Sequence, residues 1–324
     1  MNFINKEKIA RENILRESEE PTGPSIKGYD FDNGVDFEKI IDSYATTGEQ
    51  ASNLSEAIKI INKMRKEKAF IYLGYTSNMI TSGIREIIKY LVKNKMVDIL
   101  VTSAGGVEED IIKCLGDFKL GNFRASGKEL RDKGVNRAGN IYIPNSRYCR
   151  FEDFIIPVLT NYKDKTLPAS KLIHLLGKEI NNEESICYWA YKNNIPIFCP
   201  AITDGSLGDM IYFFKNKNPN FKVDVSDDIV AINNSTIGKE KTGVILLGAG
   251  VIKHHILNAN MFRNGADYAV YINNSSEYDG SDSGATPEEA ISWGKLSKNC
   301  ESIKVHGDAT IIFPLIVAKT FAKS

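Results

Sequence analysis

The chain has 324 residues, of which 42% are hydrophobic and 25% are charged. These values are ordinary for a soluble globular enzyme, and the length suffices for one large domain or two modest ones. Lysine and arginine together number 41, as do aspartate and glutamate, so the formal net charge is zero. Because there is no overall basic field, neither a nucleic acid nor a membrane surface is expected as a partner.

Cysteine usage and the apolar runs of the chain indicate its compartment. The sequence contains five cysteines: Cys114, Cys149, Cys187, Cys199 and Cys300. They form no CxxC motif and no cluster with histidine, so we expect free thiols in a reducing compartment. The N-terminus is charged throughout, unlike a secretory signal, and the longest apolar runs, VILLGAGVI and IIFPLIVA, are too short to span a bilayer. We therefore expect a soluble, cytoplasmic protein.

The first 36 residues differ in composition from the rest of the chain. The stretch EEPTGPSIKGYDFDNG within them has too few apolar residues to build a core. Residues 1–36 are therefore expected to form a flexible arm or a segment that docks on another surface. Residues 37–324 contain no low-complexity linker, and we expect them to form a single catalytic domain.

Short apolar segments alternate with helical patterns along this domain. The segments AFIYLGY (69–75) and VDILVTS (97–103) predict strands, and each is followed by a helical pattern, TSGIREIIKYLVKN or AGGVEEDIIKCL. Later, IPIFCPA, TGVILLGAG, DYAVYIN and SIKVH are typical of strands buried on both faces. The alternation predicts a doubly wound α/β fold, in which helices cover both faces of a mainly parallel, Rossmann-like sheet. In such sheets ligands bind beyond the carboxyl ends of the strands.

The loops after these strands are rich in glycine and hydroxyl side chains, as a backbone that approaches a ligand closely requires. The six loops span residues 74–83, 102–110, 201–209, 248–255, 272–284 and 306–310. The fourth, GAGVIKHH, begins like a dinucleotide fingerprint, but Lys253 replaces its third glycine, which weakens that signal. Its His254 and His255 lack a third metal ligand nearby, so we expect no metal site and consider one of them as a proton shuttle.

Several of these loops carry carboxylates. Glu108 and Glu109 stand in the first turn of a predicted helix, where they either stabilise the helix or bind a ribose hydroxyl or an amine. Asp204 and Asp209 flank two glycines in TDGSLGD, which is either a capped turn or a ligand-facing loop.

The segment YDGSDSGATPEEAISWGK (278–295) is the most acidic loop and leads into a short helix. Thr286 suits the N-cap, and Glu289 completes a Thr-x-x-Glu capping box, which alone could explain Glu289. Trp293 suits a cation–π contact with an amine or a place in the core. A nucleophilic Lys295 would need desolvation or cationic neighbours to lose its proton.

Seven carboxylates thus lie on loops that we expect to converge: Glu108, Glu109, Asp204, Asp209, Asp279, Asp282 and Glu289. Several carboxylates around one pocket select a ligand with several positive charges. A lone Mg²⁺ or Ca²⁺ would need fewer ligands at tighter spacing. The residues therefore favour a polyamine.

Five strings together resemble the deoxyhypusine synthase family, in order and over residues 40 to 320. They are YLGYTSNMITSGIRE, VDILVTSAGGVEEDIIKCL, TDGSLGDMI, KHHILNANMFRNGADYAVYIN and DGSDSGATPEEAISWGK. The resemblance implies NAD-dependent transfer of the 4-aminobutyl group of spermidine to one lysine of translation initiation factor 5A, with release of 1,3-diaminopropane. An enzyme lysine carries the butylimine, and the retained NADH reduces it at the end, so the enzyme is a transferase.

The resemblance also assigns roles to residues. It implies Lys295 as the covalent carrier and His254 as the residue that handles the proton. It implies contacts with NAD at Ser77, Asn78, Met79, Ile80, Thr81, Ser103, Ala104, Gly105, Glu109, Asp204, Asn274, Asp308 and Ala309. It implies contacts with spermidine at Glu108, Glu109, Asp209, His254, Asp279, Gly280, Ser281, Asp282, Ser283, Gly284, Ala285, Thr286, Glu289 and Trp293.

The same resemblance implies a homotetramer with active sites between paired subunits, and an N-terminal segment that can cover the entrance of a neighbour's site. Two positions depart from the family pattern: Ala249 stands where a glycine is frequent, and Thr286 where an arginine is frequent. Neither removes a group that the reaction needs. Two alternatives stay open, a homospermidine synthase-like enzyme that transfers the butyl group to putrescine, and an inactive paralogue that serves as a structural subunit.

Overall fold

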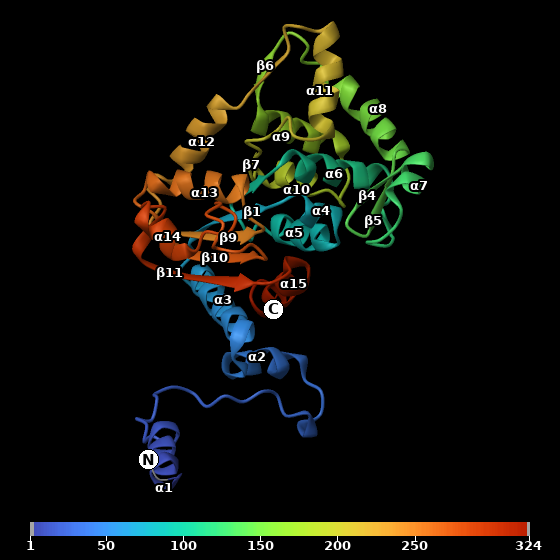
Figure 1. Ribbon diagram of the computed structural model, residues 1–324. Helices are drawn as coiled ribbons and strands as arrows, with labels where there is room; N and C mark the ends of the chain where they lie inside the picture. The colour runs from blue at the N-terminus through green and yellow to red at the C-terminus, as the bar shows by residue number, and fades with distance from the viewer. Residues whose placement is uncertain (1–2, 323–324) are drawn as a thin grey trace.

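A computed structural model describes residues 3–322 of the chain, and its central element is a sheet of six parallel strands in the order β11-β10-β9-β1-β2-β7. The strands are β1 (Phe70–Tyr75), β2 (Ile99–Thr102), β7 (Ile197–Phe198), β9 (Thr242–Leu247), β10 (Ala266–Asn273) and β11 (Leu296–His306). The expected doubly wound α/β fold with a mainly parallel sheet is confirmed (Figure 1). The strand predicted over 195–201 is shorter, and the one predicted over 302–306 is longer.

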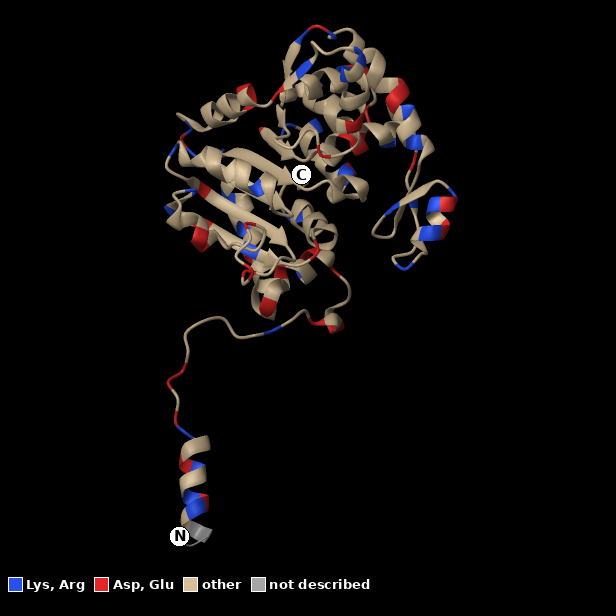
Figure 2. Ribbon diagram, turned by 45° about the horizontal axis from the view of Figure 1, so that its top comes forward, with Lys and Arg blue, Asp and Glu red and all other residues tan. Residues whose placement is uncertain are grey.

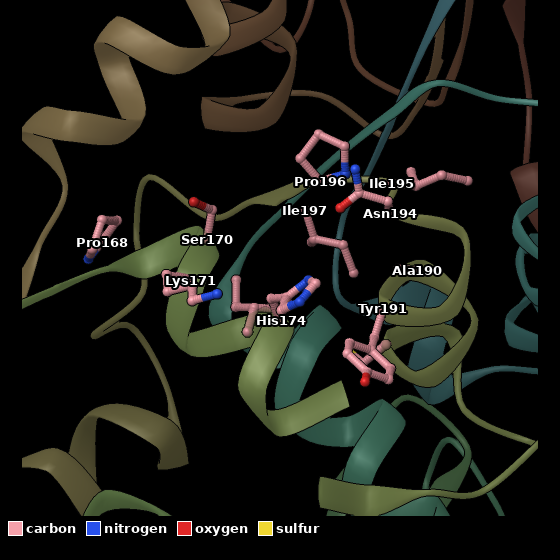
Figure 3. Close-up of a pocket in the computed structure, with 12 residues that line it drawn as sticks. Pro168, Ser170, Lys171, His174, Ala190, Tyr191, Asn194, Ile195, Pro196 and Ile197 are labelled. Atoms are coloured by element: carbon pink, nitrogen blue, oxygen red, sulfur yellow. The ribbon is translucent and has the colours of Figure 1, made fainter. Parts of the chain in front are cut away.

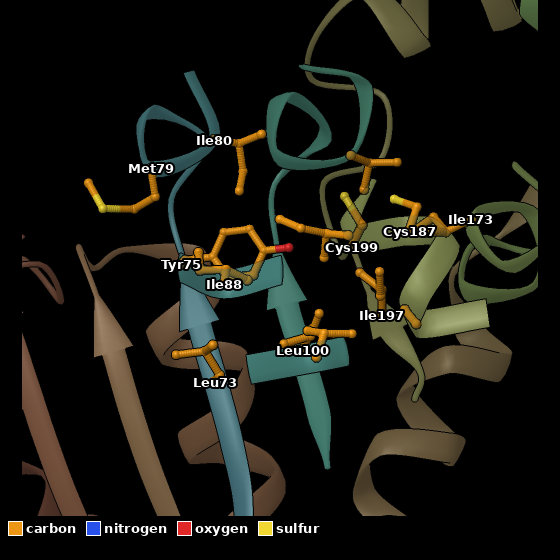
Figure 4. Packing of buried hydrophobic residues seen from close by; sticks show 14 of the residues in the cluster. Leu73, Tyr75, Met79, Ile80, Ile88, Leu100, Ile173, Cys187, Ile197 and Cys199 are labelled. Carbon is orange, nitrogen blue, oxygen red and sulfur yellow. The ribbon is translucent and has the colours of Figure 1, made fainter. Parts of the chain in front are cut away.

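Both faces of the sheet are buried, because successive strand residues point to opposite sides. In β1, Leu73 and Tyr75 pack in one hydrophobic cluster, whereas Tyr72 packs in the other. In β9, Ile245 belongs to the first cluster and Leu246 to the second. Figure 4 shows part of the first cluster. These strands are therefore apolar at nearly every position rather than at every second one.

Helices cover both faces, as the sequence predicts (Figure 1). On one face lie α3 (Glu49–Lys66), α5 (Ile84–Lys93) and α15 (Ala309–Lys319), and on the other α12 (Ser226–Thr236), α13 (Val251–Met261) and α14 (Pro287–Ser292). Beside and beyond the β7 edge pack α4 (Asn78–Thr81), α6 (Ala104–Leu115), α8 (Ser146–Thr160), α9 (Ala169–Ile180), α10 (Ile186–Asn193) and α11 (Ser206–Lys217). None of the described helices has the length and apolar character needed to cross a membrane.

Two small sheets were not predicted. The strands β3 (Lys119–Leu120), β5 (Ile141–Pro144) and β4 (Val135–Ala138) pair antiparallel and, with α7 (Gly127–Asp132), form a lobe at one end of the molecule (Figure 2). The strands β6 (Thr166–Pro168) and β8 (Lys222–Asp224) form a parallel pair. All five strands are two to four residues long, too short to show a periodic pattern.

The N-terminal segment lies apart from the domain in Figures 1 and 2. It contains α1 (Phe3–Ile14), whose residues 5–14 are exposed, and a 3₁₀ turn, η1 (Phe31–Asn33). The following helix α2 (Phe37–Thr47) joins the domain, where Lys319 of α15 pairs with the carboxylates of Glu38 and Asp42. Helix α2 is thus tied to α15, while the division of the chain at residue 37 and the mobility and docking of residues 1–36 stay predictions.

Candidate active site

The first part of the site lies where β1 and β2 end, at neighbouring positions of the carboxyl edge. Helix α4 follows β1, and α6 begins two residues after β2. At Gly105 an added Cβ would come 2.7 Å from the Cβ of Ser77, so only glycine permits this approach. The segments 77–81 and 103–105, both predicted to contact a cofactor, therefore lie side by side.

Within the 77–81 segment, some side chains are buried in the core and others face the site. Met79 and Ile80 are buried in the core, as Figure 4 shows, which leaves only their backbone for a ligand. Thr81 instead donates its hydroxyl to the carboxylate of Glu109. Lys113 of α6 also holds the segment in place, because its ammonium donates to the carbonyls of Ile80 (2.6 Å) and Ser82 (2.8 Å).

Glu108 is the most buried carboxylate among the predicted site residues, with 6% of its surface exposed. Its Oε2 accepts a hydrogen bond from the backbone N–H of Leu207 (2.5 Å), and its carboxylate lies against Gly205 of the 201–209 loop. Burial raises the pKa of Glu108, and the charges of Asp209 and Asp204 raise it further. Glu108, Asp204 and Asp209 therefore form one acidic cluster.

A hollow of about 410 Å³ opens beside this cluster, between α11 and the base of the small lobe. It is lined by Asn136, Asn145, Tyr148, Ser206, Asp209, Met210 and Phe213. Burial and the nearby charges of Glu109 and Glu108 raise the pKa of Tyr148 to about 12. The phenol thus stays protonated beside the carboxylates and can donate a hydrogen bond, a role that the sequence did not suggest.

Asp110, which follows the two glutamates, fixes the helix that carries them. It is fully buried and accepts hydrogen bonds from Arg85 Nε (2.8 Å), Ser185 Oγ (2.6 Å) and the backbone N–H of Cys187 (3.0 Å). These bonds tie α6 to α5 and α10. A buried charge with several partners is costly to disturb, so the position of Glu108 and Glu109 is well determined.

The second part of the site surrounds Lys295, which is 8% exposed. Its ammonium lies 5.7 Å from the ring centre of Trp293, whose own surface is 62% exposed, so this tryptophan is not a core residue. His254 is exposed on α13, and its Nδ1 lies 3.1 Å from Nδ2 of Asn258. A desolvated amine beside an exposed indole is a suitable place for a cationic ligand.

The predicted capping at Thr286 is confirmed. Thr286 is the N-cap of α14, its Oγ1 accepts from the backbone N–H of Glu289 (3.5 Å), and Pro287 opens the helix. In the preceding loop, the carboxylate of Asp279 accepts from the N–H of Ser281 (2.8 Å), and the backbone bond lowers the pKa of Asp279. Asp279 thus has a local structural role beside the predicted contact with a substrate.

The remaining predicted cofactor residues lie at the carboxyl ends of β10 and β11. Asn274 is exposed directly after β10, and Asp308 is the N-cap of α15, where it accepts from the N–H of Thr310 (2.8 Å). Ala309 is buried in the first turn of that helix.

In one chain the two parts of the site do not meet. The carbonyl of Lys295 accepts from the N–H of Ala266, the first residue of β10, so Lys295 lies at the amino edge of the sheet. Glu108 lies at the carboxyl edge, beyond β2. The strands β11 and β2 are four positions apart, which at about 4.8 Å per strand places them about 19 Å apart. The seven carboxylates expected around one pocket therefore divide into a group near Glu108 and a group near Lys295.

A different cavity, of about 370 Å³, opens between α9, α10 and the amino end of β7, where His174 and Tyr191 are in edge-to-face contact (Figure 3). No predicted site residue lines it, and it faces away from the carboxyl edge of the sheet. The candidate active site is therefore not this cavity.

The burial of Glu109 leads to a testable prediction about how the stability of the protein depends on pH. Burial, the largest influence, raises its pKa to about 7, above the usual 4.5. Since the folded form holds this proton more tightly than the unfolded form, the contribution of Glu109 to folding is greatest below pH 4.5 and declines until about pH 7. In Glu109→Gln this decline should be absent, so the variant should gain about 3 kcal/mol over the wild type between pH 4.5 and 8, as denaturant unfolding would measure. A difference in the free energy of unfolding between variant and wild type that stays the same at all pH values would contradict the raised pKa of Glu109.

Comparisons with known proteins place the chain among a group of related enzymes. The family model for deoxyhypusine synthase matches residues 39–320. Deoxyhypusine synthase from Senecio vernalis is 53% identical over 95% of this chain and 92% of its own length. Homospermidine synthase 2 from the same plant is 51% identical over 98% of this chain and 96% of its own. A crystal structure from Entamoeba histolytica, described as a deoxyhypusine synthase, covers 92% of this chain and 97% of its own, with a TM-score of 0.66 and 40% identity.

Proposed function

Because the chain belongs to the deoxyhypusine synthase family and is a transferase, we propose that it transfers the 4-aminobutyl group of spermidine to a lysine of translation initiation factor 5A. The products are a deoxyhypusine residue and 1,3-diaminopropane. The observation that carries the proposal is the acidic cluster of Glu108, Asp204 and Asp209. Among the described residues no cation lies within 4 Å of these carboxylates, so the cluster suits the ammonium groups of a polyamine.

The residues of the carboxyl edge fit NAD. The close approach of Gly105 to Ser77 brings the backbones of two loops together at the carboxyl ends of β1 and β2, where a dinucleotide binds in such sheets, and Glu109 would accept a hydrogen bond from a ribose hydroxyl. When bound, NAD would supply the hydride acceptor for oxidation of spermidine at the carbon next to its secondary amine and, as NADH, the hydride donor for the final reduction. Asn274, Asp308 and Ala309 would complete the contacts with the cofactor from the ends of β10 and β11.

The chain's own residues then handle the amine chemistry. Glu108 and Asp209 would bind ammonium groups of spermidine, and His254 would take the proton of the secondary amine as it is oxidised to an imine. The amine of Lys295 attacks the imine carbon, 1,3-diaminopropane leaves with its nitrogen and a proton, and Lys295 holds the butyl group as an imine. The acceptor lysine would displace Lys295 in the same way, which leaves the butyl group as an imine on the acceptor, ready for reduction. No net oxidation results.

The separation of the two groups supports a site shared between subunits. The group around Lys295 cannot reach the group around Glu108 of its own chain, whereas a second copy can supply it. We therefore propose a homotetramer of paired subunits with active sites between the partners. Within this arrangement the arm of residues 1–36 would cover a neighbour's site, and the protein would act in the cytoplasm.

A second candidate function is the transfer of the butyl group to putrescine. It is favoured by the 51% identity to homospermidine synthases, which nearly equals the identity to deoxyhypusine synthases. Both reactions need the same butyl pocket, so only the acceptor distinguishes them.

The experiment that tests these functions uses purified protein, NAD and radiolabelled spermidine, with either the factor 5A protein or putrescine as acceptor. Label in the protein is the expected result. Label only in a small amine would establish the homospermidine synthase-like function. If transfer needs an added second chain, the protein would be the structural subunit, and the proposal would fail.

A further inference from the structure

The acidic loop that joins β10 to α14 already surrounds a cation, the side chain of Lys253. This lysine lies in the first turn of α13 and is 1% exposed. Its ammonium donates to the carbonyls of Asp282 (2.5 Å) and Ala285 (2.7 Å) and lies 5.1 Å from the ring centre of Tyr271. Two loop carbonyls and an aromatic face therefore enclose the charge.

A second lysine, Lys304 of β11, binds the same loop at two other points. Its ammonium donates to the carbonyl of Ser275 (2.8 Å) at the beginning of the loop and to that of Gly284 (3.0 Å) near its end. Gly284 lies so close to the carbonyl of Ser276 that any side chain would collide with it. Lys304 thus closes the loop on itself, while Lys253 ties its end to α13.

The location of Lys253 is unfavourable for a lysine. Full burial of an ammonium group costs free energy, and the first turn of a helix disfavours a positive charge. Burial lowers the pKa of Lys253, Lys304 and Lys295 act in the same direction, and Asp282 and Glu289 oppose them. A residue that is costly here needs a compensating interaction, and the two carbonyl bonds provide it.

We propose that Lys253 and Lys304 are positioning residues, which hold residues 275–286 in the conformation that presents Asp279 and Asp282 to a polyamine and sets the start of α14. This inference rests on the proposed function. Both lysines bind backbone carbonyls, so they leave the carboxylates of the loop available to a substrate. Among the described residues, Oδ2 of Asp282 is buried without a hydrogen-bond partner, so this oxygen takes no part in holding the loop.

The bonds of Lys253 and Lys304 also affect the position of the nucleophile Lys295, because the short helix α14 connects the loop to it. Ala285, held by Lys253, immediately precedes the N-cap Thr286, and Lys295 follows only three residues after the end of α14. A displacement of about 1 Å at a reacting group can cost about a hundredfold in rate. Loss of either lysine is therefore expected to affect both the binding of spermidine and the transfer step.

The test compares Lys253→Met and Lys304→Met with the wild type. Each variant should raise the KM for spermidine about tenfold or more and lower kcat, and hydrogen–deuterium exchange over residues 275–286 should become faster. Lys253→Arg keeps the charge and the hydrogen-bond donors, so its KM for spermidine and its kcat should lie between those of Lys253→Met and the wild type. If Lys253→Met does not fold, the half-buried Lys304 supplies the test alone.

Lys319→Met is the matched control, since Lys319 is 3% exposed and donates to the carbonyl of Glu38, away from the loop. It should lower the melting temperature and leave the KM for spermidine unchanged. Unchanged loop exchange or an unchanged KM in both test variants would overturn the inference. If the wild type itself oxidises no spermidine, the proposed function fails, while the exchange measurement still decides whether the two lysines hold the loop.

Discussion

Lys295→Ala is expected to lose transfer of the aminobutyl group to the protein acceptor by about a thousandfold or more, while it still forms NADH from spermidine. The transfer needs a covalent carrier, and Lys295 is the buried amine beside the exposed Trp293. Oxidation of spermidine depends on the groups that hold the cofactor and the ammonium groups, which Lys295→Ala leaves in place. Radiolabel transfer and the absorbance of NADH, measured on the same sample, separate the two steps.

Lys298→Ala is the control for this experiment. Lys298 is exposed on β11, three residues beyond Lys295, and its loss should leave both steps unchanged. Transfer at the wild-type rate by Lys295→Ala would show that another amine carries the butyl group. Lys253 would then be the first to examine, because its electrostatic interaction with Lys295 places it in the same region.

The sheet could be predicted from the sequence because its strands are apolar on both faces. Ile245 and Leu246 are adjacent in the chain yet pack in opposite clusters, and a run of such residues between glycine-rich turns indicates a buried parallel strand. The lobe around β5 could not be predicted in this way, since its strands are short and only partly buried. Its sheet exists because antiparallel partners are close in the chain, not because of a hydrophobic pattern.

One local feature near the candidate site was predicted from the sequence. The capping of α14 by Thr286 is a local interaction over three residues, so its residue types suffice to identify it. The role of Lys253 was missed, because at the sequence level it only interrupts a glycine fingerprint. Its partners Asp282 and Ala285 are 29 and 32 residues away, and no local rule connects them.

The expectation that all seven carboxylates line one pocket could not be checked from the order of strands in the sequence, because it depends on which loops lie close together in space. All loops after parallel strands lie at one edge of a sheet, but that edge is wide, and β11 and β2 are four positions apart, so the groups near Lys295 and Glu108 do not meet within one chain. The proposal of a site shared between subunits therefore rests on this separation and on the resemblance to a family with shared sites, not on the pattern of strands.

Two inactive variants should therefore restore each other's activity when they are co-expressed. Lys295→Ala keeps the group near Glu108 intact, and Glu108→Gln keeps the group near Lys295 intact. In a mixed pair, one of the two shared sites combines both intact groups, and the other combines both altered ones. With random pairing, half of the pairs are mixed, so about one quarter of the wild-type activity should return. Differently tagged chains allow the mixed pairs to be purified, in which about half of the activity is expected.

The control combines Glu108→Gln with Asp209→Ala. Both changes fall in the same acidic cluster, so every shared site in a mixed pair contains one altered cluster, and activity should not return. Recovery in this control as well would indicate that the variants are simply not inactive. If purified mixed pairs of Lys295→Ala and Glu108→Gln stay inactive, Lys295 must act on a substrate bound within its own chain. That result would require a movement of about 19 Å across the sheet, which the packing of α13 on β10 and β11 and of α14 on β11 opposes.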